Sequence, residues 1–205
     1  MKHFIYFSSK AVTSGNALAS QDLMKAGRMD IAIHSFIQGV FLSHNVREDI
    51  TFHFIFYGMP DPPKHIEISV KKQIGLPEDK KQGRIDLSKK DVAGLIKKLL
   101  YKYRPGQKTE VLPGCFIEKK SFLNIIQDLL NKDIQVFILD KKGEDLRKAK
   151  ISKDCAFILG DQEGLPKKEM KRLKKELTPI SVGPKMYFAS QTIAVVNNEL
   201  DRRGI

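Results

Sequence analysis

The chain has 205 residues, of which 41% are hydrophobic and 29% are charged, and its formal net charge is +12. Apolar segments recur from end to end, which argues against disorder, and no run of about 18 apolar residues could span a membrane. The basic charge favours an anionic partner, most often nucleic acid and less often an anionic membrane, over a merely solvated lysine-rich surface.

Features of a secretory signal are missing from the start of the sequence, where a short apolar run is followed by polar residues. The two cysteines, Cys115 and Cys155, lack the paired spacing of zinc ligands. We therefore expect a cytoplasmic protein with two buried, reduced thiols and no metal. A disulfide would fit only a hyperthermophilic source.

The first third of the chain predicts strands that alternate with a loop and a helix. Apolar runs predict strands at His3–Phe7, Thr51–Tyr57 and His65–Val70. Small polar residues predict a loop at Ser8–Asn16, and apolar residues at helical spacing predict a helix over Asp30–His44.

In the middle of the chain two serines mark the starts of helices. A charged loop is predicted at Lys71–Gly83, before the first of them. Ser88 and Asp91 have the spacing of a capping box, which predicts a helix to about Tyr103. Ser121 is the expected N-cap of a second helix.

The last third has the pattern of a parallel sheet. Continuous apolar runs predict buried strands at Ile134–Leu139, Cys155–Leu159 and Pro179–Val182. Helices are predicted at Lys167–Leu177 and Tyr187–Leu200. Because no repeat or low-complexity linker divides the chain, we expect a single domain over all 205 residues. Its predicted fold is α/β, with a mostly parallel twisted sheet flanked by helices.

Each of these last strands leads into a loop that contains glycine, namely Leu139–Gly143, Gly160–Pro166 and Gly183–Met186. In open α/β sheets ligands bind at the carboxyl ends of strands, and glycine lets the backbone approach a ligand closely. Together the loops could enclose an adenine ring, or each glycine could simply end its strand. The phosphate signatures G-x-G-x-x-G and G-x-x-x-x-G-K-[ST] are absent, which argues against a dinucleotide site or a P-loop.

Two segments resemble the cofactor region of the SPOUT methyltransferases: FILGDQEGLP at Phe157–Pro166 and ISVGPKMYFASQTIAVVNNEL at Ile180–Leu200. The resemblance implies a C-terminal trefoil knot, a rare topology, and S-adenosylmethionine bound in a bent conformation. It also implies a homodimer whose interface includes the last helix. The cofactor contacts that it implies are Leu139, Gly160, Gly164, Ile180, Val182, Gly183, Met186 and Ala189.

The N-terminal half resembles one branch of this superfamily, the archaeal tRNA pseudouridine-54 N1-methyltransferases. The motifs are TSGN at Thr13–Asn16, GRMD at Gly27–Asp30 and FLSH at Phe41–His44, and the resemblance is weakest over Asp61–Pro113. It implies a tRNA substrate. The alternatives are a related knotted enzyme acting on ribosomal RNA, a non-catalytic RNA-binding protein of the same fold, and a small-molecule nucleotide enzyme.

Methylation at N1 of pseudouridine requires positioning, exclusion of water and loss of the N1 proton, which a carboxylate could accept. Asp30 is the candidate base, because a loop-to-helix junction favours an ionised carboxylate. Arg28 could hold a phosphate or the base through its planar guanidinium. Asp30 could equally be a helix cap, and Arg28 a surface residue.

Several other polar and aromatic residues have two possible interpretations each, one as a contact of substrate or cofactor and one as a structural residue. Asn16 could orient the base, and His44 could contact substrate or be structural. Asp161 and Glu163 could shape the cofactor loop or face the sulfonium charge. Tyr187, like Phe188 beside it, could stack on a base or pack in the core.

The predicted helix Lys167–Leu177 is strongly basic. Six bases crowd it against two acids, and Met170, Leu173 and Leu177 form an apolar stripe. Because it follows the Gly160–Pro166 loop, it could bind RNA phosphates near the active site, or it could be an ordinary solvated helix.

Overall fold

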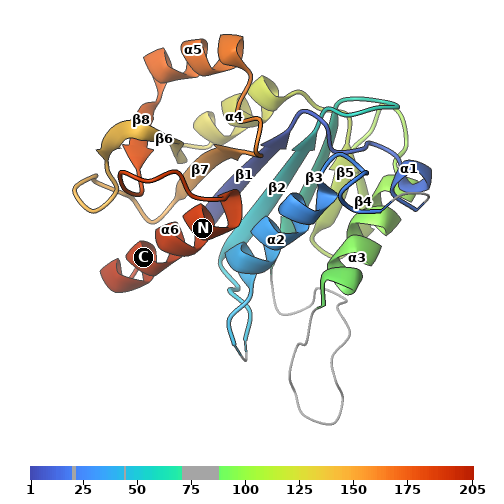
Figure 1. Ribbon diagram of the computed structural model, residues 1–205, viewed down its shortest axis with the longest axis horizontal. Helices are drawn as coiled ribbons and strands as arrows, with labels where there is room; N and C mark the ends of the chain where they lie inside the picture. The colour runs from blue at the N-terminus through green and yellow to red at the C-terminus, as the bar shows by residue number, and fades with distance from the viewer. Residues whose placement is uncertain (20–21, 44, 71–87) are drawn as a thin grey trace.

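The computed structural model describes four stretches of the chain, residues 1–19, 22–43, 45–70 and 88–205. The substrate contact predicted at His44 and the charged loop predicted at Lys71–Gly83 lie outside these stretches. The described residues build one mixed sheet with helices on both of its faces (Figure 1). No helix among them is both long enough and apolar enough to cross a membrane.

Eight strands form the sheet of the described residues. From one edge to the other they are β4 (Thr109–Leu112), β5 (Cys115–Glu118), β3 (Lys64–Ser69), β2 (Ile50–Phe56), β1 (Lys2–Ser8), β7 (Cys155–Gly160), β6 (Gln135–Asp145) and β8 (Thr178–Ser181). The five neighbouring strands β2, β1, β7, β6 and β8 are parallel to one another. On the other side of β2, β3 is antiparallel to β2, β5 is antiparallel to β3, and β4 is antiparallel to β5. The predicted mostly parallel α/β sheet is therefore confirmed.

Helices cover both faces of this sheet (Figure 1). The larger core lies under α2 (Met29–Val40), α3 (Lys89–Tyr101) and α6 (Ala189–Arg203), and the short α1 (Gly15–Ala19) packs beside α3. The smaller core lies under α4 (Phe122–Leu130) and α5 (Lys167–Glu176).

The central strand β1 is buried on both sides, as its continuous apolar run predicts. Successive side chains of a strand point to opposite faces. Phe4 and Tyr6 accordingly pack in the larger core, and Ile5 and Phe7 pack in the smaller one. The carboxyl ends of β1 and of the parallel strands beside it meet at one edge of the sheet, where a ligand can reach several loops at once.

Both predicted helix starts are confirmed. Ser88 accepts a hydrogen bond from the backbone N–H of Asp91, and the Asp91 carboxylate accepts one from the N–H of Ser88. Ser121 accepts one from the N–H of Asn124. The helix predicted to continue to His44 ends earlier, because Phe41 adopts an extended backbone and pairs with Val46.

The C-terminal third departs from the prediction in its boundaries. Strand β6 continues through the segment predicted as a loop, because Ile180 pairs with both Leu139 and Glu144 and the residues between them bulge out. A Cβ on Gly143 would lie 2.5 Å from the backbone N of Ile180, so glycine at this position allows β6 and β8 to approach closely. Helix α6 begins at Ala189, later than predicted.

The antiparallel strands β4 and β5 were not predicted. Each has only four residues, and Pro113 and Gly114 separate them, so neither shows a long alternating pattern. Both cysteines are buried and free, Cys115 in β5 and Cys155 in β7, as expected for reduced thiols. Burial raises the pKa of each thiol to about 11.

Candidate cofactor pocket and active site

A cavity of about 410 Å³ opens at the carboxyl ends of β7, β6 and β8. Its walls come from the ends of these strands, from the segment that leads into α6, and from Ile31 of α2. All of the predicted cofactor contacts except Gly164 line this cavity: Leu139, Gly160, Ile180, Val182, Gly183, Met186 and Ala189. The three loops therefore meet in space, as their places in the sequence predict.

Gly164 lies in a tight turn next to Gly160, which lines the cavity. Its φ is +75°, and its N–H donates to the carbonyl of Asp161 at 3.0 Å, which closes a tight turn. A Cβ on Gly160 would lie 2.5 Å from the carbonyl carbon of Gly164. Gly164 is not among the residues that line this cavity, because the turn packs its backbone against Gly160, and its contact with the cofactor stays a prediction.

The buried carboxylate of Asp161 ties the cofactor loop to the loop after β1. It accepts hydrogen bonds from the Ser8 hydroxyl at 2.6 Å and from the N–H of Glu163 at 2.8 Å. Lys10 forms a surface ion pair with Glu163 at 2.7 Å. Of the two roles considered for Asp161, its contacts favour the shaping of loops.

Arg28 and Asp30 form a bidentate ion pair at the start of α2. The guanidinium Nε and Nη2 donate to the two carboxylate oxygens of Asp30, each at 3.0 Å. The hydrogen bond from Arg28 lowers the pKa of Asp30, so this carboxylate is ionised at neutral pH. Arg28 occupies the N-cap position and Asp30 lies in the first turn, where hydrogen bonds from the backbone of Asp30 and Ile31 also lower the pKa of its carboxylate. The next residue, Ile31, lines the cavity.

The backbone before α2 is held in an unusual conformation. Gly27 and Arg28 have φ values of 72° and 62°, both left-handed. A Cβ on Gly27 would lie 1.7 Å from the carbonyl oxygen of Lys10, so only glycine fits where these two segments cross. The crossing fixes the GRMD motif against the loop after β1 and so aims Arg28 and Asp30.

Tyr6 adds a buried phenol that the sequence analysis did not identify. Among the described residues, its hydroxyl has no hydrogen-bond partner. Burial raises the pKa of Tyr6, and the negative charges of Asp161 and Asp30 raise it further. The hydroxyl is therefore a neutral donor at the carboxyl end of β1, within the field of both carboxylates.

A second cavity, of about 680 Å³, lies between the loop after β1, the segment before α2 and the loop after β2. Lys10 and Lys25 line it, together with Gly27 and Tyr57. Asn16 lies beside it, because its neighbour Ala17 is part of the lining. This cavity was not predicted, because its walls come from separate segments of the sequence that only the fold brings together.

Two of the remaining predictions can be placed. Leu173 and Leu177 are buried in the smaller core, which confirms the apolar stripe of α5, and Lys174 pairs with Asp140 of the first cavity at 2.5 Å. Tyr187 and Phe188 are exposed, 43% and 69%, so the core-packing reading is wrong for both. They stand on the segment that leads into α6, where the backbone of Phe188 is extended.

Comparison with known proteins identifies the family. Residues 1–205 match the model of a family described as "Putative SAM-dependent RNA methyltransferase". The chain belongs to this family.

Similar proteins extend over the same length. The tRNA (pseudouridine(54)-N(1))-methyltransferase of Methanocella arvoryzae is 33% identical, over 99% of this chain and 100% of its own. The protein of the same name from Methanococcoides burtonii is 30% identical, over 98% and 96%. The crystal structure of Archaeoglobus fulgidus Nep1 bound to S-adenosylhomocysteine has a TM-score of 0.62 at 14% identity, covering 100% of this chain and 99% of that one. The likeness in fold confirms the α/β architecture, and the trefoil knot stays a prediction.

The first cavity has the features that S-adenosylmethionine, the cofactor of this family, requires. Its volume falls in the range of small-molecule sites. Leu139, Ile180 and Val182 offer an apolar surface for the adenine ring. Gly160 has no side chain, so a ligand can approach its backbone closely. The wall carries charges of both signs, the carboxylates of Asp140 and Asp161 and the ammonium groups of Lys141 and Lys185, and Asp140 is paired with Lys174.

Proposed function

We propose that this protein transfers the methyl group of S-adenosylmethionine to N1 of pseudouridine 54 in the T-loop of tRNA. The observation that carries the proposal is the Arg28–Asp30 ion pair, fixed next to a residue that lines the cofactor cavity. Relatives that carry this enzyme name match the chain over nearly its whole length. We place the reaction in the cytoplasm, together with its tRNA substrate.

In this proposal the protein contributes position and proton transfer. The bound cofactor supplies an electrophilic methyl group on a cationic sulfur. Asp30 accepts the N1 proton of the base, for which its ionised carboxylate is ready. Arg28 keeps that carboxylate ionised and fixes its orientation through two parallel hydrogen bonds. The first cavity would bring the target base close to the methyl group of the cofactor and would exclude water from the reaction.

The second cavity is the proposed entry for the target nucleotide. It lies between the loops that carry TSGN and GRMD, and its wall includes Lys25 and also Lys10, which pairs with Glu163. Further positive charge lies on the exposed lysines of α5, a helix that the Lys174–Asp140 ion pair joins to the wall of the first cavity. Basic side chains on both sides of the active site suit the phosphates of a folded RNA.

The protein is also proposed to act as a homodimer that pairs through α6 and the segment before it. Met186 is 82% exposed and Phe188 is 69% exposed, next to the start of α6. Large apolar side chains that stand together on a surface mark contact sites, and these two also border the cofactor cavity.

The first test of the proposal uses methyl-labelled S-adenosylmethionine and two T-arm RNAs that differ only at the target, one with uridine and one with pseudouridine. Label on the pseudouridine RNA alone is the expected result. Label on neither RNA, while the cofactor binds, would refute the tRNA T-loop as the substrate and leave the family assignment intact. Label on both would show that the enzyme does not require pseudouridine.

A further inference from the structure

A buried chain of hydrogen bonds runs across four strands, away from the two cavities. His3 Nδ1 lies 3.0 Å from His53 Nε2, and His53 Nδ1 lies 2.9 Å from His65 Nε2. His65 Nδ1 then donates to Glu118 Oε1 at 2.9 Å. The three histidines come from β1, β2 and β3, and all are buried.

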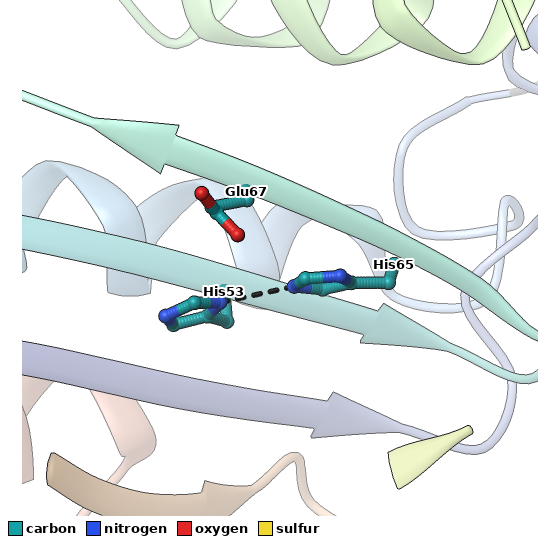
Figure 2. Close-up of side chains that lie close together, drawn as sticks. All are labelled: His53, His65 and Glu67. Carbon is teal, nitrogen blue, oxygen red and sulfur yellow. Dashed lines mark hydrogen bonds between the residues drawn. The ribbon is translucent and has the colours of Figure 1, made fainter. Parts of the chain in front are cut away.

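The sheet register places Glu67 beside this chain. Glu67 lies opposite His53 on the neighbouring strand, and it is two residues from His65, so all three side chains share one face. The ligand atoms of His53, His65 and Glu67 lie within 4.8 Å of one another. In Figure 2 the Glu67 carboxylate stands beside the gap between the two rings. The three groups thus converge from two adjacent strands.

We propose that His53 Nδ1, His65 Nε2 and a carboxylate oxygen of Glu67 bind one divalent transition-metal ion, with Zn²⁺ as the best match. Imidazole nitrogen and carboxylate oxygen are ordinary zinc donors at about 2.0–2.2 Å. Tetrahedral geometry at such lengths sets two nitrogens about 3.3 Å apart. The present separation is 2.9 Å, so the rings need to part slightly and tilt toward Glu67. Water or another small ligand completes the fourth position.

The hydrogen bonds around these residues already suit a metal site. The Glu118 carboxylate holds a proton of His65 on Nδ1, so His65 Nε2 is an acceptor, which now faces His53 Nδ1. An ion at this place would replace the proton shared by these two nitrogens, and His53 could then carry its proton on Nε2 and donate it to His3 Nδ1. Lys108 holds one oxygen of Glu67 at 2.8 Å, which leaves the other oxygen available.

Charges of both signs lie near this place. Lys108, which pairs with Glu67, opposes a cation, whereas the carboxylates of Glu67 and Glu118 attract one. The expectation of no metal rested on the absence of a sequence motif, and these ligands are assembled by strand pairing instead.

Such an ion would join β2, the last of the parallel strands, to β3, the first antiparallel one. It would therefore stabilise the attachment of the β3–β5–β4 part of the sheet and take no part in methyl transfer. An ion that binds only the folded chain raises its stability in proportion to the logarithm of its concentration.

The test uses tag-free, chelator-treated full-length protein, titrated with Zn²⁺ by calorimetry and with Co²⁺ by visible absorption. We expect one ion per chain, a tetrahedral Co²⁺ spectrum and a higher melting temperature with Zn²⁺. His65→Gln should abolish binding and Glu67→Gln should weaken it at least tenfold. Glu67 is only partly buried, so its variant tests the site without loss of the fold, which circular dichroism verifies.

His34→Gln is the matched control, because His34 lies on α2 and outside the cluster. It should bind Zn²⁺ like the wild type. Absence of stoichiometric binding to the wild type would overturn the proposal, and so would equal affinity of the wild type and Glu67→Gln. Loss of binding in His34→Gln would move the ion to another site and equally refute it.

Discussion

The two ends of the sheet are built on different principles. At the β7–β6–β8 end, the cofactor cavity is made largely of backbone and apolar side chains from loops that each follow a strand. At the β3–β5–β4 end, a buried row of polar side chains links residues from strands far apart in the sequence. The cofactor cavity at the first end depends on the path of the chain, whereas the proposed metal site at the second end depends on which strands pair.

The largest effect is expected on the rate of methyl transfer when Asp30, at the cofactor end of the sheet, is replaced. Asp30→Asn removes the proton acceptor and should lower the single-turnover rate of methyl transfer by about 10²–10⁴-fold. Cofactor affinity should stay within about twofold of the wild type, because Asp30 does not line the cavity. Asp133→Asn, an exposed change between α4 and β6, is the control. An unchanged rate in Asp30→Asn would remove this residue from the mechanism.

Gly160→Val should come next in effect and should act on cofactor binding. The new Cβ would meet the backbone of Gly164 at 2.5 Å, which forces the cofactor loop outward. Overpacking of this kind costs about 1–3 kcal/mol, and we expect cofactor affinity to fall about tenfold or more in calorimetry. Gly94→Ala on α3, where none of the described residues lies within 4 Å of the new Cβ, should bind the cofactor normally. Normal binding by Gly160→Val would contradict the backbone-built pocket.

At the other end of the sheet, Glu118→Ala should lower stability and spare cofactor binding. It leaves the Nδ1–H of buried His65 without its acceptor, at a cost of about 1–3 kcal/mol in chemical denaturation. The hydrogen bond from His65 lowers the pKa of Glu118. The carboxylate's contribution is therefore present above the pKa of an unfolded Glu and is lost as pH falls through the lower folded pKa. A stability difference that persists below that range would show that the ionised carboxylate is not its source.

The smallest expected effect concerns RNA. Lys171→Ala with Lys175→Ala removes two exposed charges of α5, and it should reduce the salt slope of RNA binding by about 2. Lys97→Ala with Lys98→Ala on α3 removes the same charge at the far side of the molecule and should leave the slope unchanged (Figure 1). Equal slopes for the two double variants would mean that α5 does not touch RNA.

The sequence predicted one end of the sheet much better than the other, for a physical reason. The residues of the cofactor cavity occur in short continuous segments, so a loop such as Gly160–Pro166 can be recognised in the sequence alone. The contact between His65 and Glu118 joins residues 53 positions apart and depends on the antiparallel pairing of β3 with β5. Short strands such as β5 carry too little periodicity to predict that pairing.

Within the active site the same limit applies. The ion pair of Arg28 with Asp30 could be expected from residues two apart, although its bidentate geometry could not. The position of Tyr6 within the electrostatic influence of Asp161 and Asp30 depends on the meeting of β1, β7 and α2, which no local pattern encodes.

The bonds between the loop after β1 and the cofactor loop have a thermodynamic consequence. Ser8 holds Asp161, and Lys10, which lines the proposed entry for the nucleotide, holds Glu163. A ligand that orders one of these loops thereby prepares the other. The factor by which cofactor tightens RNA binding must then equal the factor by which RNA tightens cofactor binding, so either ligand can gate the other.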